Sequence, residues 1–503
     1  MELAPTLAAA FQNLLTDPAA LFYLAVGVVV GICFGALPGL TVITGLALLL
    51  PITFQMDPVP ALGMLIGVYV GGIAGGAIPA ILLNIPGTPA SVATALDGHP
   101  MAKSGRAGQA LGWTVVASLV GGMIGWAALT LIAPQLASFA LRFGPPEYAA
   151  LAFLGLTVIA GVSSGSILKG VLGGMLGVSL SFVGVDPITG HMRFTFGSVH
   201  LMGGIALMPA LVGLFAIPEI LNSLSGKAAG SAPTMAHGKL LPGFGAILRQ
   251  SYNLVRSAVI GVLIGIMPAA GSNIASFIAY FQARRGSRAP QNFGKGEESG
   301  VIAAESANNG VTGGALVPLL TLGIPGDSIT AILLGGLMIH GLQPGPNLFR
   351  GDLYVVYGIF AALFVANLLM VLTLRYGIKG FVQVLRIPRH YLAPILLILA
   401  VIGVFSLNNN WFDVWVMLAL GGFGFLLALG GFPLAPVVLG LVLGPLLESQ
   451  TRRSLILSGG DWSIFVTRPL TLVLITLALL VLFGAPIANW LRQRRKGASG
   501  TGA

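Results

Sequence analysis

Four segments combine proline, glycine and a small polar residue inside otherwise apolar runs. They span residues 38–41, 84–91, 268–273 and 325–328. Such breaks leave backbone N–H and C=O groups free to bind a ligand. Irregular backbone survives in hydrocarbon only where it is buried in protein or lines a wet cavity. The breaks fall at paired positions along the chain, so we interpret them as parts of one polar pocket. The alternative is a set of proline kinks without a ligand.

The second break predicts a helical hairpin. Pro86 ends a helix, because its ring clashes with the preceding turn, and Gly87 allows a tight reversal. Thr88 has the character of an N-cap, with Pro89 at the first helical position. Free N–H groups at such a helix start attract anions, including carboxylates. The fourth break repeats this design, with Asp327 or Ser328 as the cap.

Polar side chains in apolar surroundings are the other candidates. We predict that Asn84, Asn308 and Asn309 line the pocket, although such amides can also only join helices by hydrogen bonds. Glu305 either belongs to the site or begins a helix near water. Asp327 would repel an anion, so its expected role is helix cap or neighbour of a cation.

The predicted site therefore has two parts. The substrate-binding residues are Asn84, Gly87, Thr88, Pro89, Ser91, Asn273, Asn308, Asn309, Gly326, Asp327 and Ser328. Backbone groups suited to a sodium ion are those of Gly39, Thr41, Gly271 and Gly310. Beyond sodium as a coupling ion, no metal and no cofactor is expected.

Composition excludes several classes of protein. Hydrophobic residues make up 56% of the 503 residues and charged residues only 8%, against about 25% charged in a typical soluble domain. An ordinary soluble enzyme, a disordered chain and a nucleic-acid-binding domain are excluded, and a polytopic membrane protein remains. The single cysteine, Cys33, excludes a disulfide framework. No HExxH or Walker pattern occurs, and the GxSxG pattern at 161–165 lacks a preceding strand, so an enzyme is not expected.

An internal duplication is the strongest organisational signal. Residues 31–38 match 261–268 at an offset of 230, and residues 81–87 match 320–326 at an offset of 239. The loop at 51–60 has no Lys or Arg, whereas its equivalent at 282–299 has four; the loop at 97–109 carries Lys103 and Arg106, whereas 336–348 carries neither. Lys and Arg collect in loops on the cytoplasmic side of a membrane, so equivalent loops with opposite Lys and Arg content are expected on opposite sides of the membrane. This pattern indicates an inverted repeat. A parallel duplication with random loop charge is the alternative.

These patterns predict an all-α polytopic membrane protein of about twelve transmembrane helices in two inverted repeats, with re-entrant or broken hairpins. The expected divisions are an N-terminal segment (1–19), a first membrane repeat (20–221), a linker (222–249), a second repeat (250–447), a C-terminal loop and last span (448–491) and a basic disordered tail (492–503). We expect the C-terminus to be cytoplasmic.

A family resemblance rests on five motifs taken together. They are Pro38-Gly39-Leu40-Thr41, Leu83-Asn84-Ile85-Pro86-Gly87-Thr88-Pro89, Ala95-Leu96-Asp97-Gly98, Asn308-Asn309-Gly310 and Leu322-Gly323-Ile324-Pro325-Gly326. Together they resemble the TctA family, the large membrane subunit of tripartite tricarboxylate transporters, over about residues 15–490. Two departures, at 73–77 and at Asp327, leave the particular substrate open.

The resemblance implies three things. Such systems work with a periplasmic solute-binding protein and a small membrane subunit of about four helices. An ion gradient, commonly of sodium, drives carboxylate uptake without ATP. An elevator-like motion of the hairpin-bearing part is also implied. We therefore expect a bacterial inner-membrane permease that imports a small, tricarboxylate-like anion with sodium or protons and binds no nucleic acid. The rivals are a channel or exporter of the same architecture, an intramembrane enzyme, and a structural subunit without a transport path.

Overall fold

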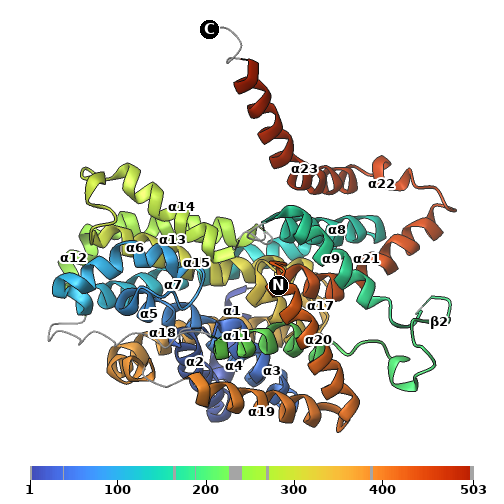
Figure 1. The fold of residues 1–503 in the computed structure, drawn as a ribbon, viewed down its shortest axis with the longest axis horizontal. Helices are drawn as coiled ribbons and strands as arrows, with labels where there is room; N and C mark the ends of the chain where they lie inside the picture. Colours follow the sequence, from blue (N-terminus) through green and yellow to red (C-terminus); the bar gives the residue numbers. More distant parts are fainter. Residues whose placement is uncertain are drawn as a thin grey trace. The chain divides into compact units, whose positions relative to one another are not determined.

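The fold is almost entirely helical. The computed structural model describes residues 3–37, 39–162, 166–186, 188–225, 241–267, 271–385 and 389–498. Within these ranges the only sheet is an antiparallel pair of two-residue strands, β1 (Gly184–Val185) and β2 (Met192–Arg193). The predicted all-α class is therefore confirmed (Figure 1).

Seven helical segments of the described chain are long and apolar enough to cross a membrane. Six further apolar helices are shorter, among them Val42–Thr53 and Ser328–Ile339. Short apolar helices beside glycine- and proline-rich turns are what broken spans would leave. The chain is a multi-pass membrane protein, and the number of about twelve spans stays a prediction.

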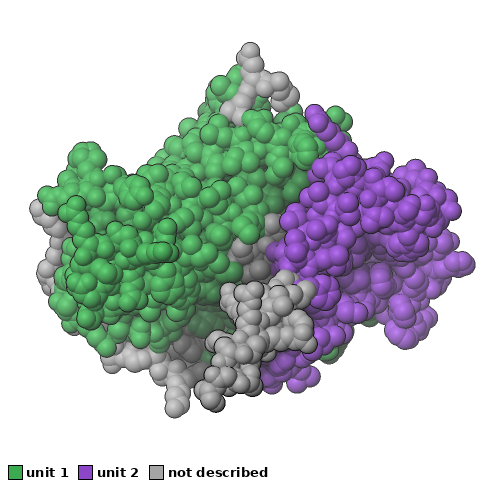
Figure 2. All heavy atoms as spheres, turned by 90° about the horizontal axis from the view of Figure 1, so that it is seen from above, with its two compact units in different colours: residues 1–141, 208–425 green, residues 142–207, 426–503 purple. Residues whose placement is uncertain are grey.

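Two compact units divide the chain, and Figure 2 colours them separately. Unit 1 comprises residues 1–141 and 208–425. Its helices before residue 142 are α1 Leu3–Thr16, α2 Pro18–Ala36, α3 Val42–Thr53, α4 Pro58–Gly75, α5 Ala77–Leu83, α6 Ser91–Met101, the π-helix η1 Ala102–Arg106 and α7 Ala107–Ala140. Those after residue 206 are α10 Leu207–Leu211, the π-helix η3 Val212–Ala216, α11 Ile217–Ser225, α12 Phe244–Arg249, α13 Ser251–Ile266, α14 Gly271–Gly286, the 3-10 helix η4 Pro290–Asn292, α15 Glu298–Leu322, α16 Ser328–Ile339, α17 Leu348–Gly351, α18 Leu353–Val384, α19 Arg389–Asn408 and α20 Trp411–Leu429.

Glycines let the helices of unit 1 meet backbone to backbone. A Cβ added to Gly31 or Gly35 of α2 would lie 2.4 Å or 2.2 Å from a backbone oxygen of α4. A Cβ added to Gly261 of α13 would lie 2.1 Å from the carbonyl oxygen of Ala307 in α15. Small residues at helix contacts are the usual packing solution in lipid, where little hydrophobic force acts between helices. The pairs α2–α4 and α13–α15 are therefore fixed at close range.

A buried carboxylate joins α6 to the start of α15. Asp97 Oδ1 accepts hydrogen bonds from the backbone N–H groups of Gly294, Gly296 and Glu297, at 2.8, 2.8 and 2.9 Å. Its other oxygen accepts from the Tyr280 hydroxyl at 2.9 Å. The Asp97 side chain has no solvent exposure. The connection after α14 is therefore fastened to α6 by one side chain.

Unit 2 comprises residues 142–207 and 426–503. Besides β1 and β2, its elements are α8 Pro145–Val162, α9 Ile167–Ser181, the 3-10 helix η2 Val199–Leu201, α21 Leu434–Leu457, α22 Ile464–Thr467 and α23 Pro469–Ala498. An ion-pair network holds the β1–β2 turn to α21. Arg452 Nη1 lies 2.8 Å from Asp186 Oδ2, and Arg193 Nη1 lies 2.6 Å from Glu448 Oε1. The hydrogen bond from Arg452 holds the pKa of Asp186 well below its usual range.

One sequence expectation differs from the structure, and two others reach beyond the described residues. Residues 97–109, predicted as a loop, are helical, and the turn is confined to Gly105, whose positive φ of 79° relieves the bend. The helix α23 is described as far as Ala498, and residues 499–503 lie outside the described chain, so the disordered tail expected at 492–503 stays a prediction. The linker prediction falls partly on residues 226–240, which also lie outside it. The repeat boundaries stay a prediction.

Candidate functional site

The first hairpin connects α5 to α6. The helix α5 ends at Leu83 and is capped by Asn84, which adopts the left-handed conformation with a φ of 57°. The Ile85 N–H donates to the Pro79 carbonyl at 3.3 Å. The Gly87 N–H donates to the Gly76 carbonyl at 3.2 Å. A Cβ added to Gly87 would lie 2.0 Å from the carbonyl oxygen of Gly35. Only glycine therefore fits at this tip.

The helix after this tip begins later than the sequence suggests. It starts at Ser91, so Pro89 is not its first residue and Thr88 is not its N-cap. The reason is an intervening turn, in which the Ser91 N–H donates to the Thr88 carbonyl at 3.0 Å. The hydroxyls of Thr88 and Ser91 lie 2.7 Å apart. Both side chains are buried, whereas Pro89 is exposed.

The second hairpin connects α15 to α16. Gly323 ends α15 with a φ of 71°, and the Ile324 N–H donates to the Pro318 carbonyl at 3.3 Å. A Cβ added to Gly326 would lie 2.7 Å from Ala315 Cα and 2.8 Å from the carbonyl oxygen of Gly265. The second tip is therefore also closely packed against backbone atoms, although less closely than the first.

Asp327 caps α16, one of the two caps predicted for this position. Its Oδ1 accepts from the Thr330 N–H at 2.7 Å, and the Thr330 hydroxyl closes the capping box. Its Oδ2 accepts from the hydroxyl of Tyr69 at 2.9 Å. Ser328 is the first residue of the helix and is half-buried.

The two hairpins are built alike at equivalent positions. The hydrogen bond from Ile85 to Pro79 and the bond from Ile324 to Pro318 have the same length and are separated by 239 residues. The Thr88–Ser91 contact occupies the positions of the Asp327–Thr330 capping box at the same offset. The correspondence therefore extends from sequence letters to individual hydrogen bonds.

Both hairpins contact α4 or the residue that ends it. A Cβ added to Gly76 would lie 2.7 Å from Thr88 and 2.8 Å from Ser91, whereas Asp327 reaches α4 at Tyr69. Seven residues separate these two points, which corresponds to about 10 Å along a helix. In the break at 268–273, Gly271 at the start of α14 also lies near the second hairpin, because a Cβ added to it would lie 3.7 Å from the Cβ of Asp327.

Asn308 and Asn309 do not lie at the second tip. Both are fully buried in the middle of α15, and thirteen residues separate Asn309 from the end of the helix, about 20 Å. The Asn309 amide donates to the Ser118 hydroxyl of α7 at 2.8 Å. Thr94 of α6 donates a hydrogen bond to Glu305. The two amides thus belong to a second polar cluster, which involves the first hairpin.

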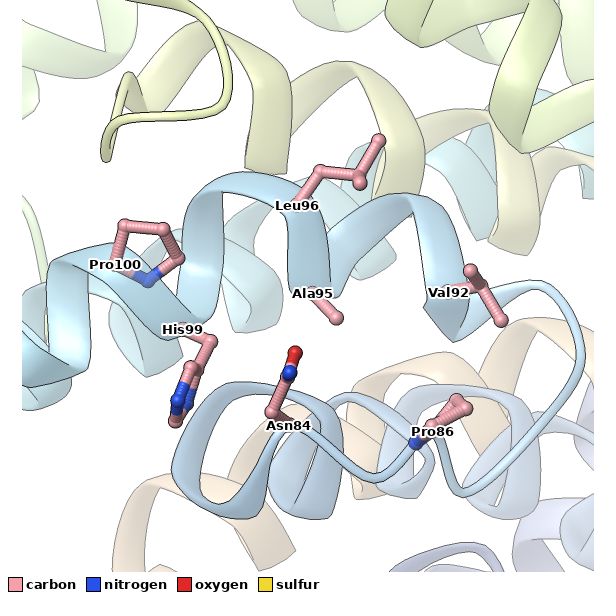
Figure 3. Close-up of a pocket in the computed structure, with 7 residues that line it drawn as sticks. All are labelled: Asn84, Pro86, Val92, Ala95, Leu96, His99 and Pro100. Carbon is pink, nitrogen blue, oxygen red and sulfur yellow. The ribbon is translucent and has the colours of Figure 1, made fainter.

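Asn84 lines a cavity of about 310 Å³ behind the first hairpin. The other lining residues are Pro86, Val92, Ala95, Leu96, His99 and Pro100. In Figure 3 the Asn84 and His99 side chains face the space between the end of α5 and α6. His99 Nδ1 lies 2.9 Å from the Ile81 carbonyl oxygen. Asn273 is exposed in the first turn of α14.

The predicted cation groups have different surroundings. Gly39 is exposed with a φ of 88°, and Gly271 has a φ of 65°; the prolines before them, Pro38 and Pro268, lie outside the described residues. Thr41 donates a hydrogen bond to Glu219 of α11 at 3.0 Å, and Thr44 donates to the same oxygen. Gly310 is explained by packing, because a Cβ there would lie 2.6 Å from the Ala258 carbonyl oxygen of α13.

Sequence reasoning missed four polar partners: Tyr69, Thr94, Ser118 and Glu219. Glu219 had a usable signal, since it follows an apolar run at 207–218 and ionisable residues in such settings are commonly functional. The other three carry no local signal, because Tyr, Thr and Ser are unremarkable in membrane helices. Their importance depends on contacts between distant segments.

Comparison with known proteins identifies the family of the chain. The model of the tripartite tricarboxylate transporter TctA family matches residues 21–439. An uncharacterised 52.8 kDa protein in the TAR-I ttuC' 3' region of Agrobacterium vitis is 39% identical over 479 residues, which cover 95% of each chain. An uncharacterised protein in the TAR-II ttuC' 3' region of the same organism is 39% identical over 235 residues, 47% of this chain and 97% of that relative. No solved structure matches significantly. The chain therefore belongs to the tripartite tricarboxylate transporter TctA family.

Proposed function

We propose that the chain is a secondary active permease that imports a small carboxylate. Family membership makes it a membrane component of a tripartite transport system rather than an enzyme. The further proposal is that a sodium or proton gradient drives uptake across the bacterial inner membrane, with the C-terminus in the cytoplasm. A periplasmic solute-binding protein would deliver the anion, and a small membrane subunit of about four helices would complete the complex.

The observation that carries the proposal is the pair of equally built hairpins. Matching hydrogen bonds at an offset of 239 support a duplication, and opposite basic bias of equivalent loops supports its inversion. In inverted-repeat transporters, broken helices of the two halves meet near the middle of the membrane and bind the substrate there. About twelve spans would accommodate two such halves.

The anion is expected at the first tip. The start of α6 carries the neutral hydroxyls of Thr88 and Ser91, so the positive end of this helix has no acidic side chain to compete with a carboxylate. The start of α16 already holds the carboxyl group of Asp327, bonded to Tyr69 and Thr330. A second negative group is disfavoured there. Asn273, Gly326 and Ser328 would line the remainder of the pocket, and Gly39, Thr41 and Gly271 would offer groups to a coupling cation.

Reconstituted vesicles provide the test. Vesicles containing the chain, its small subunit and the cognate binding protein should accumulate labelled citrate only when both the binding protein and an inward ion gradient are present. Replacing Thr88 or Ser328 by alanine should impair uptake at least several-fold. Ser138→Ala is the matched control, because that hydroxyl is exposed and bonds only within α7.

Two outcomes would contradict the proposal. Citrate movement that needs neither a gradient nor the binding protein would support the alternative, a channel or exporter of the same architecture for another organic anion. Undiminished uptake by both alanine variants would remove the hairpin tips from the transport path and favour a structural role.

A further inference from the structure

Glu305 is a buried acid whose hydrogen-bond partners are neutral. It lies two turns from the start of α15 and has no solvent exposure. Thr94 of α6 donates to its Oε1, and the Asn309 amide lies 3.5 Å from its Oε2. That amide also donates to Ser118 of α7 at 2.8 Å. Three helices therefore enclose the acid with hydroxyl and amide groups.

No described cationic group faces this acid. The 34 residues of α7 contain no charged residue and no histidine. On the other helices packed against α15, Arg256 donates to Asn253, and Arg284, Arg285, Arg350 and Tyr252 are exposed. The other titratable side chains on these helices have partners elsewhere. His99 lies beside the Ile81 carbonyl, and the hydroxyls of Tyr69 and Tyr280 donate hydrogen bonds to Asp327 and Asp97. Glu298, on α15 itself, accepts hydrogen bonds from Gln109 and Trp113. Asp97, one turn along α6 from Thr94, adds like charge. An unpaired buried carboxylate is much less stable than the neutral acid.

A neighbouring amide points to the same protonation state. Both polar atoms of the Asn308 side chain are buried without a hydrogen-bond partner, as is Asn309 Oδ1. Residues three and four positions apart share one face of a helix, so the two amide side chains lie on the same face of α15 as Glu305. An ionised carboxylate could satisfy only the unpaired amide nitrogen of Asn308, whereas the neutral acid can accept from that nitrogen and also has one O–H to donate to an amide oxygen. Protonation therefore supplies the donor that the cluster lacks.

We propose that Glu305 is the proton-binding residue of this transporter, and that the proton is carried in the body of helices that includes the first hairpin. This inference rests on the proposed function and specifies its coupling ion. Thr94 and Asn308 are positioning residues: the hydroxyl holds one carboxyl oxygen, and the amide accepts the acidic hydrogen. Binding and release transfer one proton between this carboxyl group and water, and no other bond changes.

Infrared spectroscopy of the purified protein at neutral pH tests the proton independently of transport. The spectrum should contain the C=O band of a protonated carboxylic acid, which Glu305→Gln loses and Glu298→Gln keeps. Glu298 is the matched control, because it lies two turns earlier on the same helix. Thr94→Val keeps the acid but removes its donor, so it should shift that band to higher frequency. This second variant decides the matter if Glu305→Gln does not fold.

Three results would overturn the inference. They are a wild-type spectrum that Glu305→Gln leaves unchanged, a band that Thr94→Val does not shift, and a band that sodium chloride abolishes while choline chloride does not. The last result would assign sodium to the carboxylate.

Transport gives the second readout. In the three-component vesicles, Glu305→Gln should exchange internal for external citrate but lose accumulation driven by a proton gradient; wild-type accumulation by this variant would refute the assignment. Wild-type vesicles that move no citrate would contradict the proposed function, while the infrared result would still decide the proton.

Discussion

Gly87→Ala tests the packing of the first hairpin most directly. The added Cβ would lie 2.0 Å from the carbonyl oxygen of Gly35 and 2.8 Å from Gly76 Cα. Both neighbours are backbone atoms of packed helices, so neither can rotate away as a flexible side chain would. The hairpin tip itself must withdraw.

The size of the effect follows from these distances. Ordinary van der Waals contact begins at 3.4 Å, so the tip would have to move by roughly 1.4 Å, and overpacking of this kind typically costs about 1–3 kcal/mol. Gly87 does not have a positive φ, so no backbone strain adds to this cost. The same displacement would move Thr88 away from its place beside Gly76, and uptake should fall with stability.

Thermal unfolding of the purified variant and citrate uptake in reconstituted vesicles are the assays. Gly326→Ala should behave similarly, because its Cβ would lie 2.7 Å from Ala315 Cα. Gly380→Ala is the control: it lies within α18 with open space around the added Cβ, and alanine favours a helix by about 1 kcal/mol. Wild-type stability and uptake in both tip variants would refute the close packing of the hairpins.

Three further predictions concern single hydrogen-bonded groups. Tyr69→Phe should lower the unfolding temperature, since it leaves a buried oxygen of Asp327 without its donor at a cost of about 1–3 kcal/mol; an unchanged melting curve would contradict the contact. Asp97→Ala should accelerate amide hydrogen exchange at residues 294–297, as measured by mass spectrometry, and unchanged exchange would exclude the clamp. Asp186→Asn should destabilise the protein at neutral pH, because the pKa of Asp186 is depressed by Arg452; the difference from wild type should shrink as the pH falls through that depressed pKa, and a difference independent of pH would refute the ion pair.

The hairpins could be predicted because their signals are local. Proline ends a helix and glycine permits a reversal whatever surrounds them, so the turns at Pro86 and Pro325 were visible in the sequence, as was the cap at Asp327. Their internal similarity was equally visible, because the matched residues are prolines and glycines with few substitutes. These are properties of the backbone.

The contacts of the candidate site were less accessible. Nothing near Tyr69 in the sequence indicates that it bonds Asp327, 258 residues away. The sequence predicts Asn308 and Asn309 in the hairpin pocket because intramembrane amides often line pockets, but side-chain type does not reveal depth along a helix. The sequence predicts a start of α6 at Pro89, whereas the helix begins at Ser91, because an extra turn between Thr88 and Ser91 satisfies backbone groups that an N-cap would otherwise satisfy.

The carboxylate of Asp97 has a mechanical consequence. It accepts hydrogen bonds from three backbone N–H groups within residues 294–297 and from the hydroxyl of Tyr280. The helix α6 and the segment before α15 therefore cannot slide past each other without breaking four hydrogen bonds at once. We therefore expect the two segments to move together in any transport cycle, and we expect a covalent cross-link between them to leave citrate uptake unchanged.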